Sequence, residues 1–397
     1  MMGKIGVYGG SFNPIHLGHV RAAQEVAREF QLDRVLMIPT NIAPHKDSVD
    51  YAATGAQRLE MVQLAVADCP QLQVCDIELQ REGKSYTVDT LKQLKAMFPD
   101  DELYLIMGTD MFLSLHQWYR PDEICSMASI ICASRDKKNA AALQEQAENL
   151  SKNLHAKVYL ADNHALPMSS TTVRRMIFFD CAHAYLPQKV YDYIKCNRLY
   201  YAGANLRYLP FEKLKELSLS LHKPSRVAHV IGCCETSQKL AARWGENVAL
   251  AARAGILHDV TKALDAVEQL RVCEKYGIIL DDFVIEHHKL LHSKTAAAVA
   301  ENIFGEERKV VDAIYWHTTG RANMSTMEKI LYIADYAEPN RSFDGVEKIR
   351  CHLYEDLDLA LYTGFSMSLE ELQREGKAFD KNSYDAWQYL KKERNFV

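Results

Sequence analysis

A change of pattern halfway along this chain of 397 residues constrains its fold more than any other feature. Up to about residue 200, short runs of apolar and β-branched residues alternate with helix-like stretches such as 55–67 and 87–98. The runs are KIGVY (4–8), RVLMIP (34–39), LQVCDIE (72–78), ELYLIMG (102–108), ASIICAS (128–134) and KVYLA (157–161). Strands separated by helices need crossover connections, so this half predicts an α/β domain with a parallel sheet covered on both faces.

The second half has a different pattern. From Leu209 onward the sequence reads as one helix after another, for example in 226–245 and 247–264. The shift places a domain boundary near Gly203, and we expect domains at 1–202 and 206–397. The second domain is predicted to be all-α.

Composition narrows the class of protein. The net charge of −5 gives no support to an extended nucleic-acid surface, and no apolar run reaches the roughly 18 residues needed to cross a membrane. The start, MMGKIGVYGG, lacks the regions of a signal peptide. The ten cysteines form no CxxC pair and mostly have apolar neighbours. We therefore expect reduced thiols in a cytoplasmic protein that uses neither a nucleic acid nor a membrane as partner.

The segment GGSFNPIHLGH (9–19) follows the first strand and predicts a phosphate site. Its glycines let the backbone approach a ligand, and the helix that follows offers free N–H groups and the positive end of its dipole. Three-residue spacing puts His16 and His19 on one face of the first helical turn. We expect both rings to face a solvent-filled cleft.

Two further segments of this half carry phosphate-binding chemistry. PTNIAPHK (39–46) follows the second strand and offers His45 and Lys46. SSTTVRR (169–175) combines a hydroxyl-rich helix start with Arg174, which indicates a second phosphate cradle. No serine or cysteine is evidently paired with a base. The residues therefore favour direct phosphoryl or nucleotidyl transfer, in which positioning and charge stabilisation do the work.

These motifs resemble those of the nucleotidylyltransferase superfamily, whose fold is Rossmann-like. Within it, SYTVDTL (85–91), GTDMFLSLHQWYR (108–120) and YLPQKVYDYIKCNRLY (185–200) look like the bacterial nicotinate-nucleotide adenylyltransferases of NAD biosynthesis. The resemblance implies transfer of AMP from ATP to nicotinate mononucleotide with Mg²⁺, giving deamido-NAD and pyrophosphate. Met168 stands where isoleucine is usual in the last motif, a conservative departure.

The same resemblance assigns roles residue by residue. His16 and His19 would contact the ATP phosphates and stabilise the transition state, with Lys46 nearby. Ser170, Thr171 and Arg174 would hold the β- and γ-phosphates, and Trp118 would stack on the pyridine ring. The remaining residues of the nucleotide site would be Gly9, Gly10, Ser11, Phe12, Thr87, Gly108, Thr109 and Asp110.

Histidines and aspartates at six positions of the second half share apolar surroundings. They are His229, His258, Asp259, His292, His317 and Asp335. One buried histidine is more often an ordinary core residue, but a buried aspartate is costly unless it is paired or bound to metal. Six such groups favour a metal centre, and ligation without thiolate favours Fe, Mn, Co or Zn. Asp259 could bridge two ions that activate water towards phosphorus.

The order H…HD…H…H…D resembles the HD-domain metal-dependent phosphohydrolases. LLHS (290–293), the segment 316–341 and FDGVEKIR (343–350) look like one branch, the YqeK-like symmetrical diadenosine-tetraphosphate hydrolases. The resemblance covers about residues 209–370 and implies hydrolysis of diadenosine tetraphosphate to two ADP at a two-iron centre. Lys262 and Arg321 are candidate phosphate contacts, whereas His287 and His288 fall outside the ligand positions.

The sequence thus predicts a bifunctional enzyme and leaves two alternatives open. The first half could transfer a cytidylyl group or adenylate phosphopantetheine, against which residues 108–120 argue. The second half could be a regulatory module that binds a nucleotide without turnover, against which its complete ligand set argues. Oligomeric state, the native metal, the range of hydrolase substrates and any communication between the halves are not defined by the sequence.

Overall fold

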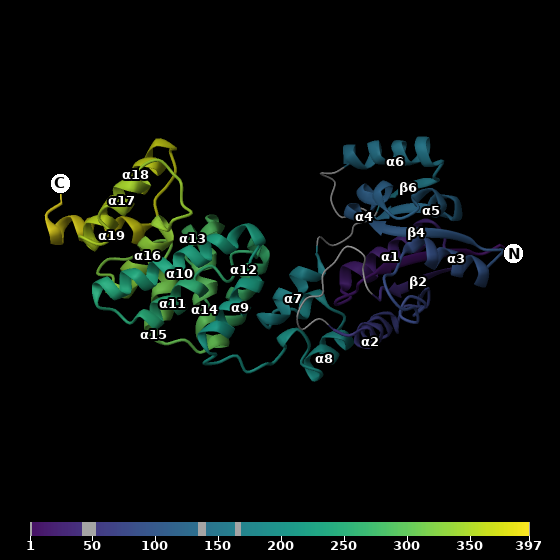
Figure 1. Cartoon of the computed structure of the whole chain (residues 1–397), viewed down its shortest axis with the longest axis horizontal. Helices are drawn as coiled ribbons and strands as arrows, with labels where there is room; N and C mark the ends of the chain where they lie inside the picture. Colours follow the sequence, from purple (N-terminus) through teal and green to yellow (C-terminus); the bar gives the residue numbers. More distant parts are fainter. Residues whose placement is uncertain (1, 42–52, 134–139, 163–167, 397) are drawn as a thin grey trace. The chain divides into compact units, whose positions relative to one another are not determined.

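The structure is a computed structural model that describes residues 2–41, 53–133, 140–162 and 168–396. Its contacts divide the chain into two compact units, Met1–Ala204 and Asn205–Val397. Strands are drawn only in the purple-to-teal part of Figure 1, and the green and yellow part is helical. The prediction of an α/β half followed by an all-α half is confirmed.

The first unit contains a six-stranded parallel sheet with the order β3-β2-β1-β4-β5-β6. The strands are β1 (Lys4–Gly10), β2 (Arg34–Pro39), β3 (Leu72–Val74), β4 (Glu102–Gly108), β5 (Ala128–Ala133) and β6 (Val158–Ala161). All six arise from the predicted runs, but β3 is shorter than its run 72–78. It ends early because Asp76 accepts a hydrogen bond from the backbone of Leu79 and starts a turn.

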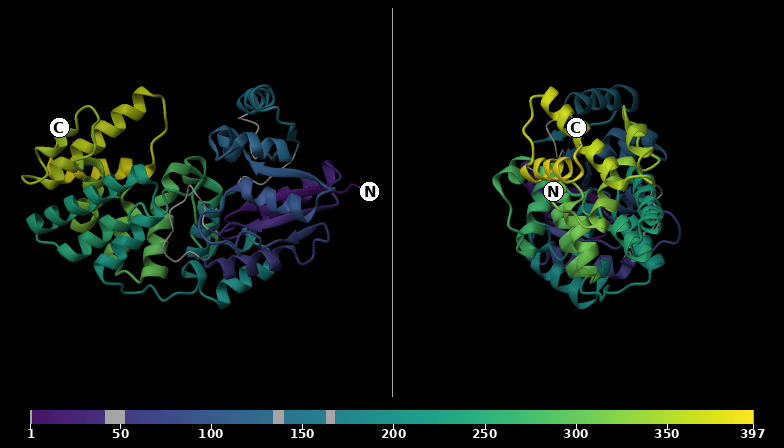
Figure 2. Two further views of the ribbon diagram at one scale, coloured as in Figure 1. Left: turned by 45° about the vertical axis from the view of Figure 1, so that its right-hand side comes forward. Right: turned by 90° about the vertical axis from the view of Figure 1, so that its left-hand side faces the viewer.

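Helices join these strands and cover the sheet. They are α1 (Leu17–Glu29), α2 (Gly55–Val66), α3 (Thr87–Met97), α4 (Thr109–Ser114), α5 (Pro121–Met127), α6 (Ala140–Leu154), α7 (Ser170–Phe178) and α8 (Gln188–Cys196). Inward-facing residues such as Ile5, Val7 and Leu105 form one core with Leu91 of α3 and Leu143 of α6. Figure 2 shows helices on both sides of the strands. This arrangement excludes water from both faces of an apolar parallel sheet.

Strand β1 is the switch point of the sheet. The chain places β2 and β3 on one side of β1 and then β4, β5 and β6 on its other side. Ligands of open parallel sheets bind at the carboxyl ends of the strands at such a switch point. The segment after β1 and the segment after β4 therefore bound the natural place for a ligand in this unit.

The second unit is formed by helices. They are α9 (Phe211–Leu221), α10 (Pro224–Trp244), α11 (Val248–Leu257), α12 (Ala266–Tyr276), α13 (Asp282–Glu286), α14 (Leu291–Val299), α15 (Arg308–Trp316), α16 (Thr326–Ala337), α17 (Val346–Arg350), α18 (Leu357–Arg374) and α19 (Lys381–Arg394). Capping boxes begin two of them, with Asp265 ahead of α12 and Ser325 ahead of α16. Helix α10 ends at Gly245, whose φ of 74° suits glycine. Helices α10, α11, α14, α15 and α16 pack together at the centre of this unit.

The cysteines and the longest apolar helices bear on two expectations from composition. All ten cysteines lie within them and have free thiols. Among the described helices, none has both the length and the apolar character needed to cross a membrane.

Candidate active sites

The first candidate site lies where β1 gives way to α1. Gly9 at the end of β1 and Gly108 at the end of β4 both face open space, since a methyl group added to either would meet no atom within 4 Å. The two strands are neighbours, so backbone on both sides of the switch point is accessible to a ligand. Phe12 closes the bottom of this loop: it is buried and adopts a positive φ of 43°, and its ring packs beside Gly10.

The two histidines of the opening motif are stacked at the start of α1. Their ring centroids are 3.6 Å apart with an interplanar angle of 25°, which confirms that they share one face of the helix. The expectation that both face solvent is wrong for His16, which is fully buried at the N-cap position because the strand–helix turn folds over it. His19 is partly exposed.

A hydrogen bond at His19 defines what that ring can offer to a ligand. The backbone N–H of His16 donates to His19 Nδ1 over 3.3 Å. In the neutral ring the proton then resides on Nε2, which makes Nε2 a hydrogen-bond donor. An Nε2–H at a helix N-terminus is suited to an anionic phosphate oxygen.

The residues predicted to cradle phosphate at α7 contact the opening loop. Arg174 Nη1 donates to the carbonyl of Asn13 (2.7 Å), and its Nη2 donates to Thr171 Oγ1 (3.1 Å). Ser170 Oγ donates to the carbonyl of Pro14 (3.0 Å). Helix α7 therefore lies against the loop after β1. This contact is necessary if the two segments form a single site.

Two residues that the sequence reasoning missed tie the same loop down. Arg58 of α2 donates to the carbonyls of Ser11 (2.8 Å) and Asn41 (3.2 Å). Tyr200 Oη donates to Asn13 Oδ1 over 2.5 Å. Burial raises the pKa of Tyr200, so its hydroxyl keeps the proton that it donates. Arg58 stands in no recognisable motif, and Tyr200 ends the segment 185–200 that resembles the family, but the role of each depends on contacts distant in sequence.

Three more predicted residues, Thr109, Asp110 and Trp118, follow the end of β4 along the chain. Thr109 is buried and Asp110 is exposed in the first turn of α4, directly after Gly108. Trp118 is half-buried; it packs against the sheet core and donates from Nε1 to Ser114 Oγ (3.3 Å). Thr87 is the first residue of α3. His45 and Lys46 lie outside the described residues.

The second candidate site is a buried cluster in the helical unit. All six predicted ligand positions contribute to it: His229 from α10, His258 and Asp259 after α11, His292 from α14, His317 after α15 and Asp335 from α16. Ligand atoms of His229, His258 and Asp335 lie within 4.8 Å of one another, and so do those of His258, Asp259 and His317. Tertiary packing therefore collects residues more than a hundred positions apart.

The Asp259 carboxylate divides its two oxygens between pairs of histidines. Oδ2 lies 3.8 Å from Nε2 of His229 and 3.5 Å from Nε2 of His258. Oδ1 lies 3.2 Å from Nε2 of His292 and 3.9 Å from Nε2 of His317. Oδ1 is also buried and makes no hydrogen bond within the described residues. An orphaned carboxylate oxygen among histidine nitrogens is the arrangement that a bound cation completes.

The orientation of three imidazoles favours ligation through Nε2. Nδ1 of His258, His292 and His317 faces a backbone carbonyl, those of Gly255 (2.8 Å), Lys289 (2.6 Å) and Ile314 (2.6 Å). A carbonyl accepts, so each Nδ1 carries the proton and each Nε2 keeps its lone pair. The Nε2 atoms of His292 and His317 are only 3.2 Å apart.

The protonation states also fit metal ligands. Burial lowers the pKa of His258 and, together with His292 and His258, holds that of His317 well below its usual value. Burial alone would raise the pKa of Asp259, but the nearby His258 and His292 hold it well below its usual value. Neutral imidazoles and ionised carboxylates are the forms that bind divalent cations. The chemistry of the cluster therefore suggests a divalent metal site.

Cationic side chains surround the cluster, and the sequence reasoning found only one of them. Arg226 pairs with Asp259, and Arg341 Nη2 donates to Asp335 Oδ1 over 2.6 Å. Lys262 Nζ lies 3.0 Å from His292 Nε2, as expected for a residue at the rim of the site. Arg226 stands three residues before His229, a spacing that could have indicated it.

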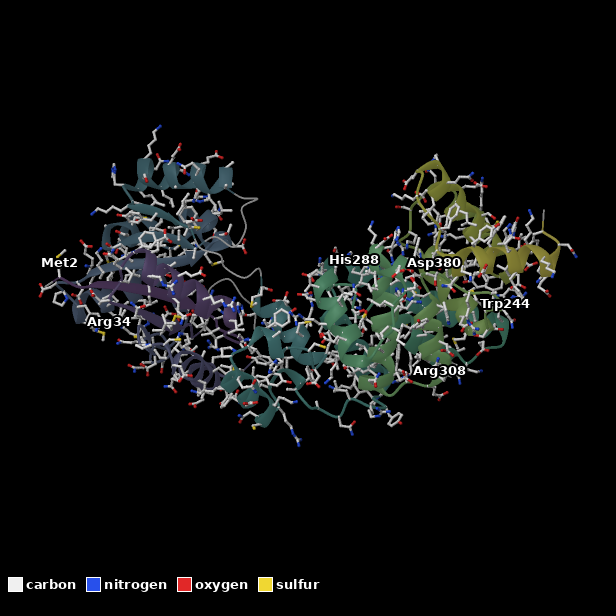
Figure 3. All side chains as sticks on the ribbon, turned by 180° about the vertical axis from the view of Figure 1, so that it is seen from behind. Met2, Arg34, Trp244, His288, Arg308 and Asp380 are labelled. Carbon is white, nitrogen blue, oxygen red and sulfur yellow. The ribbon has the colours of Figure 1, made fainter. Side chains whose placement is uncertain are left out.

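Other candidates of the second half lie apart from the cluster. Arg321 pairs with the buried Glu328 (2.9 Å), which gives it a structural contact. His287 stacks on Phe283 with ring centroids 4.0 Å apart, and the exposed His288 is labelled in Figure 3. That these two histidines are not metal ligands stays a prediction.

The folds and sites together define the class of the protein. The family model for cytidylyltransferase-like proteins matches residues 7–176, and that for the HD domain matches residues 226–340. The His/Asp cluster inside the HD-domain match suggests a divalent metal site. The chain is an adenylyltransferase joined to an HD-domain phosphohydrolase.

Individual relatives refine the assignment. A "probable nicotinate-nucleotide adenylyltransferase" of Carboxydothermus hydrogenoformans is 37% identical over 198 residues, which is 50% of this chain and 98% of the relative. A protein of the same description from Dictyoglomus thermophilum is 40% identical over 198 residues, 50% of this chain and 99% of its own length. Through this half, the chain belongs to the nicotinate-nucleotide adenylyltransferase family.

A solved structure matches the other half. It is a "predicted HD superfamily hydrolase involved in NAD metabolism" from Clostridium acetobutylicum, 33% identical in sequence. The match covers 47% of this chain and 98% of that one, with a TM-score of 0.45.

Proposed function

We propose that the first unit transfers AMP from ATP to nicotinate mononucleotide and releases pyrophosphate, with Mg²⁺ as the accompanying cation. The observation that carries the proposal is the stacked His16–His19 pair at the switch point of the sheet, beside backbone left open at Gly9 and Gly108. The family membership supplies the nucleotide chemistry.

In this proposal the chain's residues position two substrates rather than form a covalent intermediate. An oxygen of the acceptor's phosphate attacks the α-phosphorus of ATP while the bond to the bridging oxygen of pyrophosphate breaks. His19 Nε2–H donates to the α-phosphate, where charge grows in the transition state. Arg174 and Ser170 keep the loop of Asn13 and Pro14 in place and lie beside the leaving phosphates.

The test of this half is a panel of acceptors and nucleotides given to the full-length protein. We expect deamido-NAD from ATP with nicotinate mononucleotide, and a clear preference over the nicotinamide analogue. Equal efficiency with acid and amide would contradict the assignment of the ring pocket around Trp118. Turnover of CTP, or of phosphopantetheine with ATP, would favour the alternative nucleotidyl transfers.

We propose that the second unit hydrolyses diadenosine tetraphosphate symmetrically to two ADP. The position of Asp259 carries this proposal. Each of its two carboxylate oxygens lies near a different pair of histidines, which matches two adjacent cation positions. Two divalent ions, proposed to be iron, would polarise a phosphate and activate water there. Arg226, Lys262 and Arg341 would neutralise the polyphosphate chain at the rim.

Product analysis tests this second reaction and separates it from a regulatory role. We expect ADP alone from diadenosine tetraphosphate, whereas ATP with AMP would indicate asymmetric cleavage. Replacing His292 with alanine should abolish turnover. His288→Ala is the matched control, since it removes an exposed imidazole four residues earlier in the chain. Bound metal and bound nucleotide with no turnover in the wild type would favour a sensor.

We further propose that both reactions take place in the cytoplasm. The ten free thiols are consistent with a reducing compartment, and both proposed substrates are intracellular nucleotides.

A further inference from the structure

The carboxylate of Glu338 is buried against one of the metal-site histidines. Glu338 follows α16 directly and is fully buried. Its Oε1 lies 3.1 Å from Nδ1 of His229, on the side of the ring opposite to Asp335. A buried carboxylate without a cationic partner is costly, so a hydrogen bond from a ring N–H is the interaction that keeps it there.

This contact makes His229 different from the other three histidines of the cluster. In those, Nδ1 faces a neutral backbone carbonyl three residues earlier in the chain. In His229, Nδ1 instead faces the side-chain carboxyl group of Glu338. A carboxylate behind an imidazole fixes the ring and increases the electron density that Nε2 offers to a metal. His229 is therefore the strongest imidazole donor of the set.

The surroundings of Glu338 are built to hold it in this position. Its Oε2 accepts hydrogen bonds from the backbone N–H (2.7 Å) and the side-chain amide (2.9 Å) of Asn340. The same amide donates to the carbonyl of Ala228, next to His229 (3.0 Å). A methyl group added at Gly232, one turn after His229 on α10, would overlap Oε2. Because Gly232 has no side chain, the carboxylate of Glu338 can lie against α10 at this position.

The short loop after α16 is itself anchored. Arg350 of α17 donates to the carbonyls of Ala337 (3.0 Å), Glu338 (2.7 Å) and Arg341 (2.8 Å). One loop therefore supplies the partner of His229 and, through Arg341, the partner of Asp335. Both of those ligands belong to the same group, with His258.

We propose that Glu338 is a positioning residue that acts through His229 and makes the cation position of His229, His258 and Asp335 the tighter of two. This inference rests on the proposed two-metal centre. It predicts that the two positions fill in order, the His229 position first.

The experiment is a Co²⁺ titration of the metal-free full-length protein in competition with a chelating indicator. His229→Ala and His292→Ala identify which of the two dissociation constants belongs to which position. Glu338→Gln, which keeps the volume but removes the charge, should weaken the His229 position by about 10- to 100-fold. The constant of the other position should stay within about twofold of the wild type.

Two further variants guard against a change of folding. Gly232→Ala displaces the carboxylate without altering it, and should weaken the same position. Glu328→Gln is the matched control, because Glu328 is also a buried glutamate of the α16 region but pairs with Arg321. It should lower the unfolding temperature without changing either constant.

Three results would overturn the inference. Unchanged constants in both Glu338→Gln and Gly232→Ala would show that the carboxylate does not tune the site. An equal loss at both positions would mean a general structural role. A wild type that binds no Co²⁺ would remove the metal centre as well, and so differs from a failure of this inference alone.

Discussion

Replacing Asp259 with asparagine is the sharpest test of the metal centre. The change keeps the shape of the side chain but removes its charge and one of its two oxygens. In the structure each oxygen serves a different pair of histidines, with separations of 3.5 and 3.8 Å on one side and 3.2 and 3.9 Å on the other. Asparagine can offer an oxygen to only one side.

The size of the effect is taken from the attraction between a carboxylate and a nearby cation. Unit charges about 4 Å apart attract by about 4 kcal/mol at an effective dielectric constant of about 20. Since about 1.4 kcal/mol corresponds to tenfold, losing the carboxylate charge should weaken cation binding by about a thousandfold at each position. A divalent ion, with twice the charge, should lose no less. Hydrolysis should fall below detection because it depends on both ions.

The assay is metal content by mass spectrometry, measured with both activities on the same preparation. Asp259→Asn should contain less than one metal per chain and hydrolyse no diadenosine tetraphosphate. It should keep wild-type adenylyl transfer, since that reaction uses the other unit, and this activity reports that the protein is intact. A variant that retained two metals and the wild-type rate of hydrolysis would refute the bridging role of Asp259.

Three other predictions concern the first unit and the independence of the two. His19→Ala should lower adenylyl transfer by about 100-fold or more in steady-state kinetics, the value of a preorganised donor to a transition-state phosphate, and a near-normal kcat would contradict its role. Tyr200→Phe should reduce kcat/KM for ATP by up to about tenfold, because it removes a hydrogen bond worth about 1 kcal/mol to Asn13, and should leave hydrolysis unchanged. Expressed separately, residues 1–204 and 205–397 should each fold and keep their own reaction, and an inert or insoluble fragment would argue against independence.

Local patterns were sufficient to predict the architecture. Each strand of the sheet arises from a short apolar run between helical stretches, and a parallel sheet is the packing that such alternation permits. The boundary region was visible because strand-like runs cease near Gly203. The histidine spacing in residues 9–19 likewise indicated a shared helix face, which the stacked rings confirm.

Burial and loop contacts were less accessible to sequence reasoning. His16 is fully buried at the strand–helix turn, and this burial could not be predicted from the spacing of the two histidines. Arg174 was recognised by its motif, yet its contact with the carbonyl of Asn13, 161 positions away, depends on how α7 meets the loop. Arg58 carries no motif, and the family-like segment 185–200 that ends at Tyr200 does not reveal its contact with Asn13.

The sequence by itself determined which residue types are available to each half: a glycine-rich strand end followed by two histidines, and six histidines and aspartates in apolar surroundings. Only the tertiary structure decided how they meet. The division of Asp259 between two histidine pairs and the placement of Glu338 behind His229 both require helices from separate parts of the chain to pack together. The physical reason is that periodicity reports which face of an element is buried, whereas a ligand geometry depends on the distances between faces of different elements.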